Sequence, residues 1–108
     1  MYIAICGHEL EAKPGLRIYV ERRLLSTLGH LTRAIECIVV RAHRLEQGPL
    51  RGATRCQVVA RLFRGREVVE EDSDVDQYTA IDRVAEALAR DVEYLESRLP
   101  PGEALRCA

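Results

Sequence analysis

The feature that most constrains the fold is an apolar stripe near the end of the chain. Between residues 78 and 99, apolar side chains recur at alternating spacings of three and four, which is the period of an amphipathic α-helix. Pro100 and Pro101 follow, and proline cannot continue a helix. We therefore predict a helix over residues 75 to 98, about 36 Å long, with Ser73 as its N-cap. The stripe consists of Tyr78, Ile81, Ala85, Leu88, Val92, Leu95 and Leu99.

The layer that buries this stripe is predicted from the residues before it. The run YIAIC predicts a short strand with Ile3 and Ile5 on one side, and the segment GHELEAKPG predicts a loop. A second apolar stripe predicts a helix from about residue 14 to 29. Its members are Leu16, Val20, Leu24, Leu28 and Leu31. The segments AIECIVVRAHRL, TRCQVVARLFRG and EVVEED then predict three strands joined by short turns.

The order of these elements predicts an α+β fold of the type β-α-β-β-β-α. Because three consecutive strands form a meander, the simplest arrangement is a four-stranded sheet with both helices packed on one face. Residues 1–99 would form a single domain and residues 100–108 a flexible C-terminal tail. The opposite face of the sheet would be exposed. On it we expect a secondary basic surface that contains Arg41, Arg55, Arg61 and Phe63. The ring of Phe63 beside guanidinium groups could stack a base, or it could fill the sheet edge or a dimer contact.

Several classes of function are not indicated by the sequence. The chain has no apolar run of the roughly 18 residues that a membrane span needs, and its first residues lack the pattern of a signal peptide, so we expect a cytoplasmic protein. The four cysteines form no CxxC pair and are expected to be thiols. Phosphate-binding loops, dinucleotide-binding glycine patterns, nucleophile elbows and HExxH motifs are missing. We therefore expect no enzymatic activity, metal, cofactor or small-molecule substrate.

The charges are segregated along the chain. The net charge is only −1, but residues 1–66 contain 12 Lys and Arg against 5 Asp and Glu, whereas residues 67–108 contain 4 against 12. The predicted last helix, residues 75–98, has six acids and three arginines. A charge of −3 on this helix would repel a polyanion such as RNA.

Two segments of the chain resemble a known family. The stretch from Ile3 to Leu24, with IAICGHELE and LRIYVERRL, and the stretch DQYTAID, Asp76 to Asp82, are similar to the bacterial ribosome hibernation-promoting factors. The resemblance implies the β-α-β-β-β-α fold, a surface similar to double-stranded RNA-binding domains, and binding to the small ribosomal subunit and its RNA when growth stalls in stationary phase or under stress. It implies a short form, because the second domain of longer relatives does not follow.

The resemblance also implies which residues bind RNA. Arg23, Arg33 and Arg90 match basic positions of the family, and Arg22 and Arg83 extend the set. These five arginines are the candidate RNA-binding residues, and the family works without catalysis or metal. The sequence departs from the family where basic residues are expected in the helices. Those positions hold Ser26, Ala87, Tyr94 and Glu96.

Two functions are consistent with this sequence. The first is a ribosome-associated hibernation or translation-inhibiting factor that contacts RNA phosphates of the small subunit. The second is a diverged paralogue that has lost ribosome binding and acts as a protein-binding or self-associating module. In the second case, the acidic last helix would dock on a basic partner such as the arginine-lined sheet of another copy, giving a homodimer.

Overall fold

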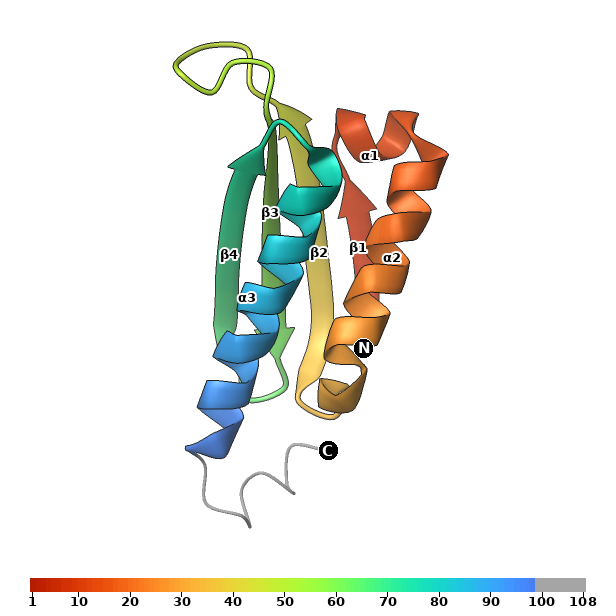
Figure 1. Cartoon of the computed structure of the whole chain (residues 1–108). Helices are drawn as coiled ribbons and strands as arrows, with labels where there is room; N and C mark the ends of the chain where they lie inside the picture. Colours follow the sequence, from red (N-terminus) through yellow and green to blue (C-terminus); the bar gives the residue numbers. More distant parts are fainter. Residues whose placement is uncertain (99–108) are drawn as a thin grey trace.

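The structure is a four-stranded mixed sheet with two long helices on one face. We describe residues 1–98 from a computed structural model of the chain (Figure 1). The strand order is β1-β2-β3-β4, with β1 parallel to β2 and the other neighbours antiparallel. The elements are β1 (Tyr2–Cys6), α1 (His8–Ala12), α2 (Pro14–Leu28), the 3₁₀ turn η1 (Gly29–Leu31), β2 (Ile35–Arg44), β3 (Thr54–Leu62), β4 (Glu67–Asp74) and α3 (Gln77–Ser97). The predicted α+β fold class is confirmed.

The parallel pairing of β1 with β2 explains where α2 lies. Two parallel strands cannot be joined by a hairpin, so the chain must cross over one face of the sheet, and α1 and α2 form this crossover. The antiparallel strands β2, β3 and β4 need only short connections, and α3 returns over the same face beside α2 (Figure 1). Both helices therefore cover one side of the sheet.

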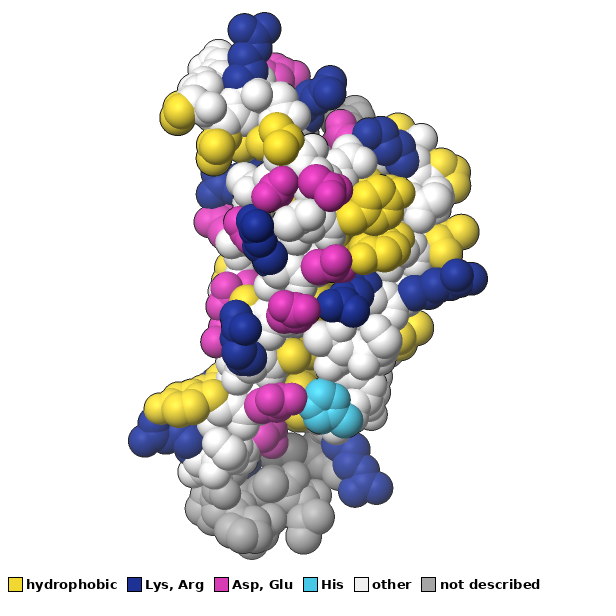
Figure 2. All heavy atoms as spheres, in the orientation of Figure 1, with side chains coloured by type: hydrophobic (Ala, Val, Ile, Leu, Met, Phe, Trp, Pro, Cys, Tyr) yellow, Lys and Arg dark blue, Asp and Glu magenta, His cyan; other side chains and the backbone are white. Residues whose placement is uncertain are grey.

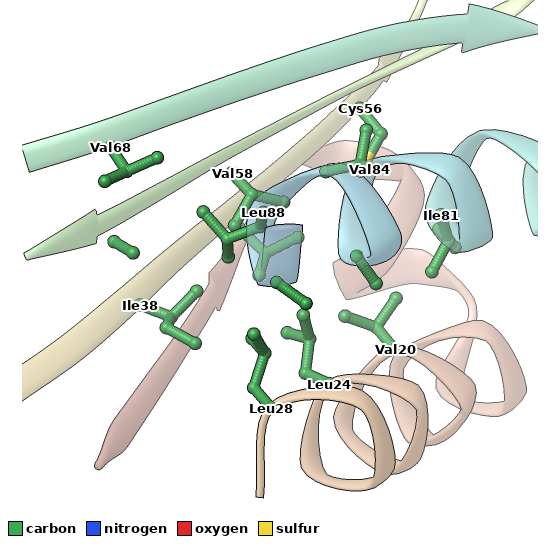
Figure 3. Packing of buried hydrophobic residues seen from close by; sticks show 14 of the residues in the cluster. Val20, Leu24, Leu28, Ile38, Cys56, Val58, Val68, Ile81, Val84 and Leu88 are labelled. Carbon is green, nitrogen blue, oxygen red and sulfur yellow. The ribbon is translucent and has the colours of Figure 1, made fainter. Parts of the chain in front are cut away.

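The core lies between the helices and this side of the sheet (Figure 3). The predicted stripe of α2 is buried at Leu16, Val20, Leu24 and Leu28. In α3 the buried side is wider than the predicted stripe, because alanines and a valine join it. Its buried residues are Ala80, Ile81, Val84, Ala85, Leu88, Ala89 and Val92. The strands contribute the alternate residues that the period-two pattern indicated, including Ile38, Val40, Val58 and Ala60.

Three details differ from the sequence predictions. The segment predicted as a loop contains α1, a helix of five residues whose Leu10 is fully buried. Ser73 does not cap the last helix, because β4 continues through it to Asp74. The cap is Asp76, whose Oδ1 accepts a hydrogen bond of 3.0 Å from the backbone N of Tyr78. The predicted tail, residues 100–108, and Leu99 lie outside the described residues.

Gly7 connects β1 to α1 at a point where no side chain fits. Its φ of 104° lies in the region that favours glycine, and a Cβ at this position would be 2.6 Å from the backbone oxygen of Ala42 in β2. The turn into the crossover therefore depends on close contact between two backbones.

We predict that Gly7→Ala lowers the free energy of unfolding by at least about 2 kcal/mol, because it adds both backbone strain and a clash. Gly15→Ala is the matched control, since Gly15 lies in α2 without a positive φ, and an added Cβ there would meet no neighbouring part of the protein within 4 Å. That control should be neutral or stabilising by about 0.5 kcal/mol. Urea unfolding curves measure both changes, and equal effects of the two substitutions would contradict the prediction.

Candidate nucleic-acid interface

The outer surface of the helix layer contains most of the predicted RNA-binding residues, and a line of contacts joins its two helices. Three side-chain pairs connect the α2–η1 segment to α3: Tyr19 with Asp82, Arg23 with Glu86, and His30 with Glu93. Each pair is separated by the same 63 residues. A constant offset means that the two helices run parallel and in register, so an acidic column on α3 faces α2.

We call this line of contacts between α2–η1 and α3 the helix seam. The two segments that resemble the hibernation factors meet at one place in it. The hydroxyl of Tyr19 donates a hydrogen bond of 2.6 Å to Oδ1 of Asp82. The rings of Tyr19 and Tyr78 pack edge to face, with centroids 4.7 Å apart. The hydrogen bond to Asp82, followed by burial, raises the pKa of Tyr19 above its usual value. Tyr78 and Asp82 therefore help to align the helices.

Arg23 is held by two carboxylates of α3. Its Nε lies 3.1 Å from Oδ1 of Asp82, as an ion pair rather than a directed hydrogen bond, and its Nη2 donates a hydrogen bond of 3.0 Å to Oε1 of Glu86. The spacing along the sequence favours an ion pair between Glu86 and Arg90 within α3, but Glu86 contacts Arg23 instead. This candidate RNA-binding arginine is thus already neutralised within the protein.

Arg83 and Arg90 lie toward the β4 edge of the helix layer. Nη1 of Arg83 is 3.0 Å from Oδ2 of Asp74 and 3.8 Å from Oδ2 of Asp72. Arg90 lies close enough to Glu70 of β4 to favour its ionised form. Both arginines therefore face acidic residues on the helix-facing side of β4.

Arg22 and Arg33 have a different environment. Arg22 is exposed on α2, and Arg33 is exposed in the turn between η1 and β2. Among residues 1–98, neither makes an ion pair or a side-chain hydrogen bond. Of the five predicted arginines, these two are the most available to a phosphate group.

The helix layer as a whole is close to neutral. The residues of α2 and α3 include five arginines and six carboxylates, a net charge of −1. On this face acidic and basic side chains are interspersed, and no continuous basic patch forms among the described residues (Figure 2). The acidic last helix is therefore partly compensated by its neighbour.

The open face of the sheet also pairs its charges internally. Arg41, Arg55 and Arg61 are exposed there, as predicted. However, Nη2 of Arg55 is 2.9 Å from Oε1 of Glu71, and Nη2 of Arg61 is 3.9 Å from Oε1 of Glu67. Phe63 is half exposed but lies just beyond the end of β3, in the turn to β4, rather than in the strand. The secondary basic surface is thus largely compensated by the acids of β4.

The other titratable groups of residues 1–98 give no sign of a metal or redox centre. Cys6, Cys37 and Cys56 are free thiols, and burial raises the pKa of Cys56 to about 12, which keeps it protonated. Within this range, no three His, Cys, Asp or Glu side chains are grouped as metal ligands. No helix in the described part of the chain is long and apolar enough to cross a membrane.

A cluster that the sequence did not predict as a site lies at the end of α3. Arg64 and Arg66 from the β3–β4 turn line a pocket together with Tyr94 of α3 and Arg98, its C-cap. In the sequence, Tyr94 stands out only as a departure from the family pattern. The available signals were the FRGR turn and the spacing of four between Tyr94 and Arg98. Only the fold shows that the two segments meet.

Residues 3–99 match the family model described as "Sigma 54 modulation protein / S30EA ribosomal protein", so the chain belongs to this family. The resemblance inferred from the sequence is confirmed. A search of curated proteins gave no match.

The solved structures that are similar to the chain include the following two. A ribosomal subunit interface protein from Coxiella burnetii is 19% identical, with a TM-score of 0.70 over 91% of this chain and 100% of that one. At this identity the likeness shows the fold alone. The N-terminal domain of Protein Y from Thermus thermophilus is 28% identical, with a TM-score of 0.62 over 87% of this chain and 94% of that one.

The carboxyl pair of Glu70 and Asp91 generates a prediction about pH. The hydrogen bond to Asp91, then burial and the charge of Asp91, raise the pKa of Glu70 from 4.5 to about 7. The folded protein therefore holds this proton more tightly than the unfolded chain. The resulting stabilisation is fully present below pH 4.5 and is lost as the pH rises through about 7.

We expect the free energy of unfolding to fall by about 1 kcal/mol between pH 5 and 8 because of this pair, after allowance for solvent screening. Glu70→Gln should flatten that part of the profile. Glu71→Gln is the control, because Glu71 is adjacent but points to the open face and contacts Arg55. Denaturant unfolding at several pH values measures the profiles, and a Glu70→Gln profile parallel to the wild type would refute the assignment.

Proposed function

We propose that the protein is a ribosome-associated hibernation or translation-inhibiting factor that binds the small ribosomal subunit through contacts with RNA phosphates. The observation that carries this proposal is the family match over residues 3–99. The fold supports it, because a domain with the same architecture is described as a ribosomal subunit interface protein. Such a protein would act in the cytoplasm, without a cofactor or a chemical step.

Within this function, the five candidate arginines divide into two groups. Arg22 and Arg33 are exposed and without acidic partners in the described part of the chain, so a phosphate can approach them directly. Arg23 and Arg83 are held by acids, and Arg90 lies near one. RNA phosphates would have to displace those carboxylates. We therefore assign the primary phosphate contacts to Arg22 and Arg33, with Arg90 in support.

The ion pairs weaken binding without preventing it. Exposed ion pairs contribute only about 0.2–1 kcal/mol each, because water and salt screen them. A ribosomal RNA surface presents many phosphates, and each contact also releases a counterion. At low salt, RNA phosphates can therefore replace the two carboxylates that pair with Arg23. A carboxylate displaced in this way takes up a cation again, so arginines with acidic partners should add less to the salt dependence of binding than exposed arginines do.

We predict that Arg22→Glu combined with Arg33→Glu abolishes cosedimentation with small ribosomal subunits at low salt. For the wild type, pelleting should decrease steeply as salt rises. Loss of each phosphate contact should reduce the slope of log K against log salt by about one unit. Circular dichroism should be unchanged, because both side chains are exposed and make no ion pair within residues 1–98.

The matched control is Arg41→Glu combined with Arg51→Glu. It changes the net charge equally, but Arg41 lies on the open sheet face and Arg51 in the β2–β3 loop. Pelleting of the control like the wild type would locate the contact on the helix side. Loss of pelleting only in the control would move the contact to the sheet side, and wild-type pelleting of the first variant would remove Arg22 and Arg33 from the site.

A second candidate function is the diverged paralogue that binds protein rather than RNA. The observation that favours it is the engagement of Arg23, which matches a basic position of the family, by two carboxylates. If the wild type remains in the supernatant even at low salt, the ribosome proposal fails and this alternative stands. Light scattering at low and high salt then tests self-association through the charged faces.

A further inference from the structure

The pocket at the end of α3 has a composition unlike that of the helix seam. It lies between the β3–β4 turn and the last turn of α3, and its volume is about 500 Å³, within the range of about 300–1,000 Å³ typical of small-ligand sites. Its floor is apolar, formed by Leu62 and Leu95. Its polar lining consists of Arg64, Arg66, Arg98 and Glu96, with Tyr94 as the aromatic member.

The charge of this lining is positive, in contrast to the neutral helix face. Three guanidinium groups line the pocket against one carboxylate, and one of the three, that of Arg64, also has a partner of its own. The pocket between β4 and α3 shows the opposite balance, with four carboxylates and two arginines. The end of α3 is therefore more favourable for a ligand with phosphate groups than the pocket between β4 and α3.

The turn between β3 and β4 fixes two of these arginines. The backbone N of Leu62 donates to the oxygen of Arg66 at 2.8 Å, and the N of Gly65 donates to the oxygen of Leu62 at 2.9 Å. Gly65 has a φ of 87°, which allows this tight turn. Arg64 and Arg66 therefore project from a hydrogen-bonded hairpin rather than from a loose loop.

Tyr94 supplies a flat surface beside these charges. Tyr94 is 58% exposed as a residue, although the apolar floor of the pocket lies next to it. The guanidinium carbon of Arg98 lies 5.0 Å from the centre of its ring, and Nη1 of Arg98 also contacts the Tyr94 hydroxyl. An exposed ring with a guanidinium on it is the arrangement on which bases stack in proteins that bind unpaired nucleotides.

We propose that this pocket binds a nucleotide, with its base stacked at Tyr94 and its phosphate at Arg66, Arg64 and Arg98. Two sources carry the same chemistry: a free nucleoside diphosphate, or one unstacked nucleotide of single-stranded RNA. The inference goes beyond the proposed ribosome binding and does not require it. The residues differ from Arg22 and Arg33, so the two sites can be tested separately.

The test uses the full chain and two probes at low salt. Isothermal titration measures the binding of adenosine diphosphate, and fluorescence anisotropy measures the binding of fluorescein-labelled octauridylate. We expect Tyr94→Ala and Arg66→Glu each to weaken binding by about tenfold, whereas Tyr94→Phe, which keeps the ring, stays within about twofold of the wild type. Tyr2→Ala and Arg41→Glu are the matched controls, since both residues are exposed on the other face of the sheet.

The outcomes are distinct. Binding of the diphosphate identifies a free nucleotide as a ligand, and binding of the octauridylate alone identifies RNA; either result supports the pocket if the variants weaken it and the controls do not. Failure of both probes to bind, or equal weakening by the controls, overturns the proposal. NMR spectra of the wild-type protein provide a second test without substitutions. Addition of either probe should shift the ring signals of Tyr94, and shifts confined to other tyrosines also overturn the proposal. Loss of ribosome cosedimentation with the pocket intact affects only the proposed function.

Discussion

The parallel alignment of α2 with α3 is the constraint on which the rest of the structure depends. Below the seam, the apolar sides of both helices are buried against the same face of the sheet. Above it, Tyr19 and Arg23 contact Asp82 and Glu86 of α3 at a constant separation along the chain. Because Tyr19 and Tyr78 also pack edge to face, a small slip of one helix would break the aromatic contact and the polar contacts together. Residues of the two segments that resemble the hibernation factors thus make the contacts that align α2 with α3.

This alignment also explains why an acidic helix is compatible with a family of ribosome-related proteins. Two of the acids on α3, Asp82 and Glu86, lie opposite Arg23, and Glu93 lies opposite His30. Part of this charge is therefore compensated by Arg23 inside the helix layer, and the field of the closed ion pairs is further reduced by screening in water. The attraction of a polyanion therefore depends on the arginines that have no acidic neighbour rather than on the net charge of α3.

Most elements of the fold could be predicted because their sequence signals are local. Periods of two and of three to four, with proline and glycine at the ends, indicate strands, helices and turns without knowledge of the fold. The helix α1 could not be predicted because its five residues are too few to show a period. In the sequence Ser73 resembles the N-cap of the last helix, because the acidic residues at the end of β4 are typical of a loop. The partner of Glu86 could not be predicted either, because Arg23 and Glu86 meet only through the register of two helices 63 residues apart.

The segregation of charge along the chain disappears when the chain folds, for a topological reason. The basic first part forms β1, α2, β2 and β3, and the acidic part forms β4 and α3. The antiparallel register places β4 beside β3, so that Glu67 and Glu71 meet Arg61 and Arg55, while α3 lies beside α2. Each acidic element is therefore adjacent to a basic one in its own layer, so the charge segregation along the sequence is reduced in the folded domain, residues 1–98. At the turn between β3 and β4, Arg64 and Arg66 lie beside Arg98 at the end of α3, with Glu96 as the one carboxylate in the lining of that pocket. A polyanion would therefore meet cations at that end of the molecule as well as at Arg22 and Arg33.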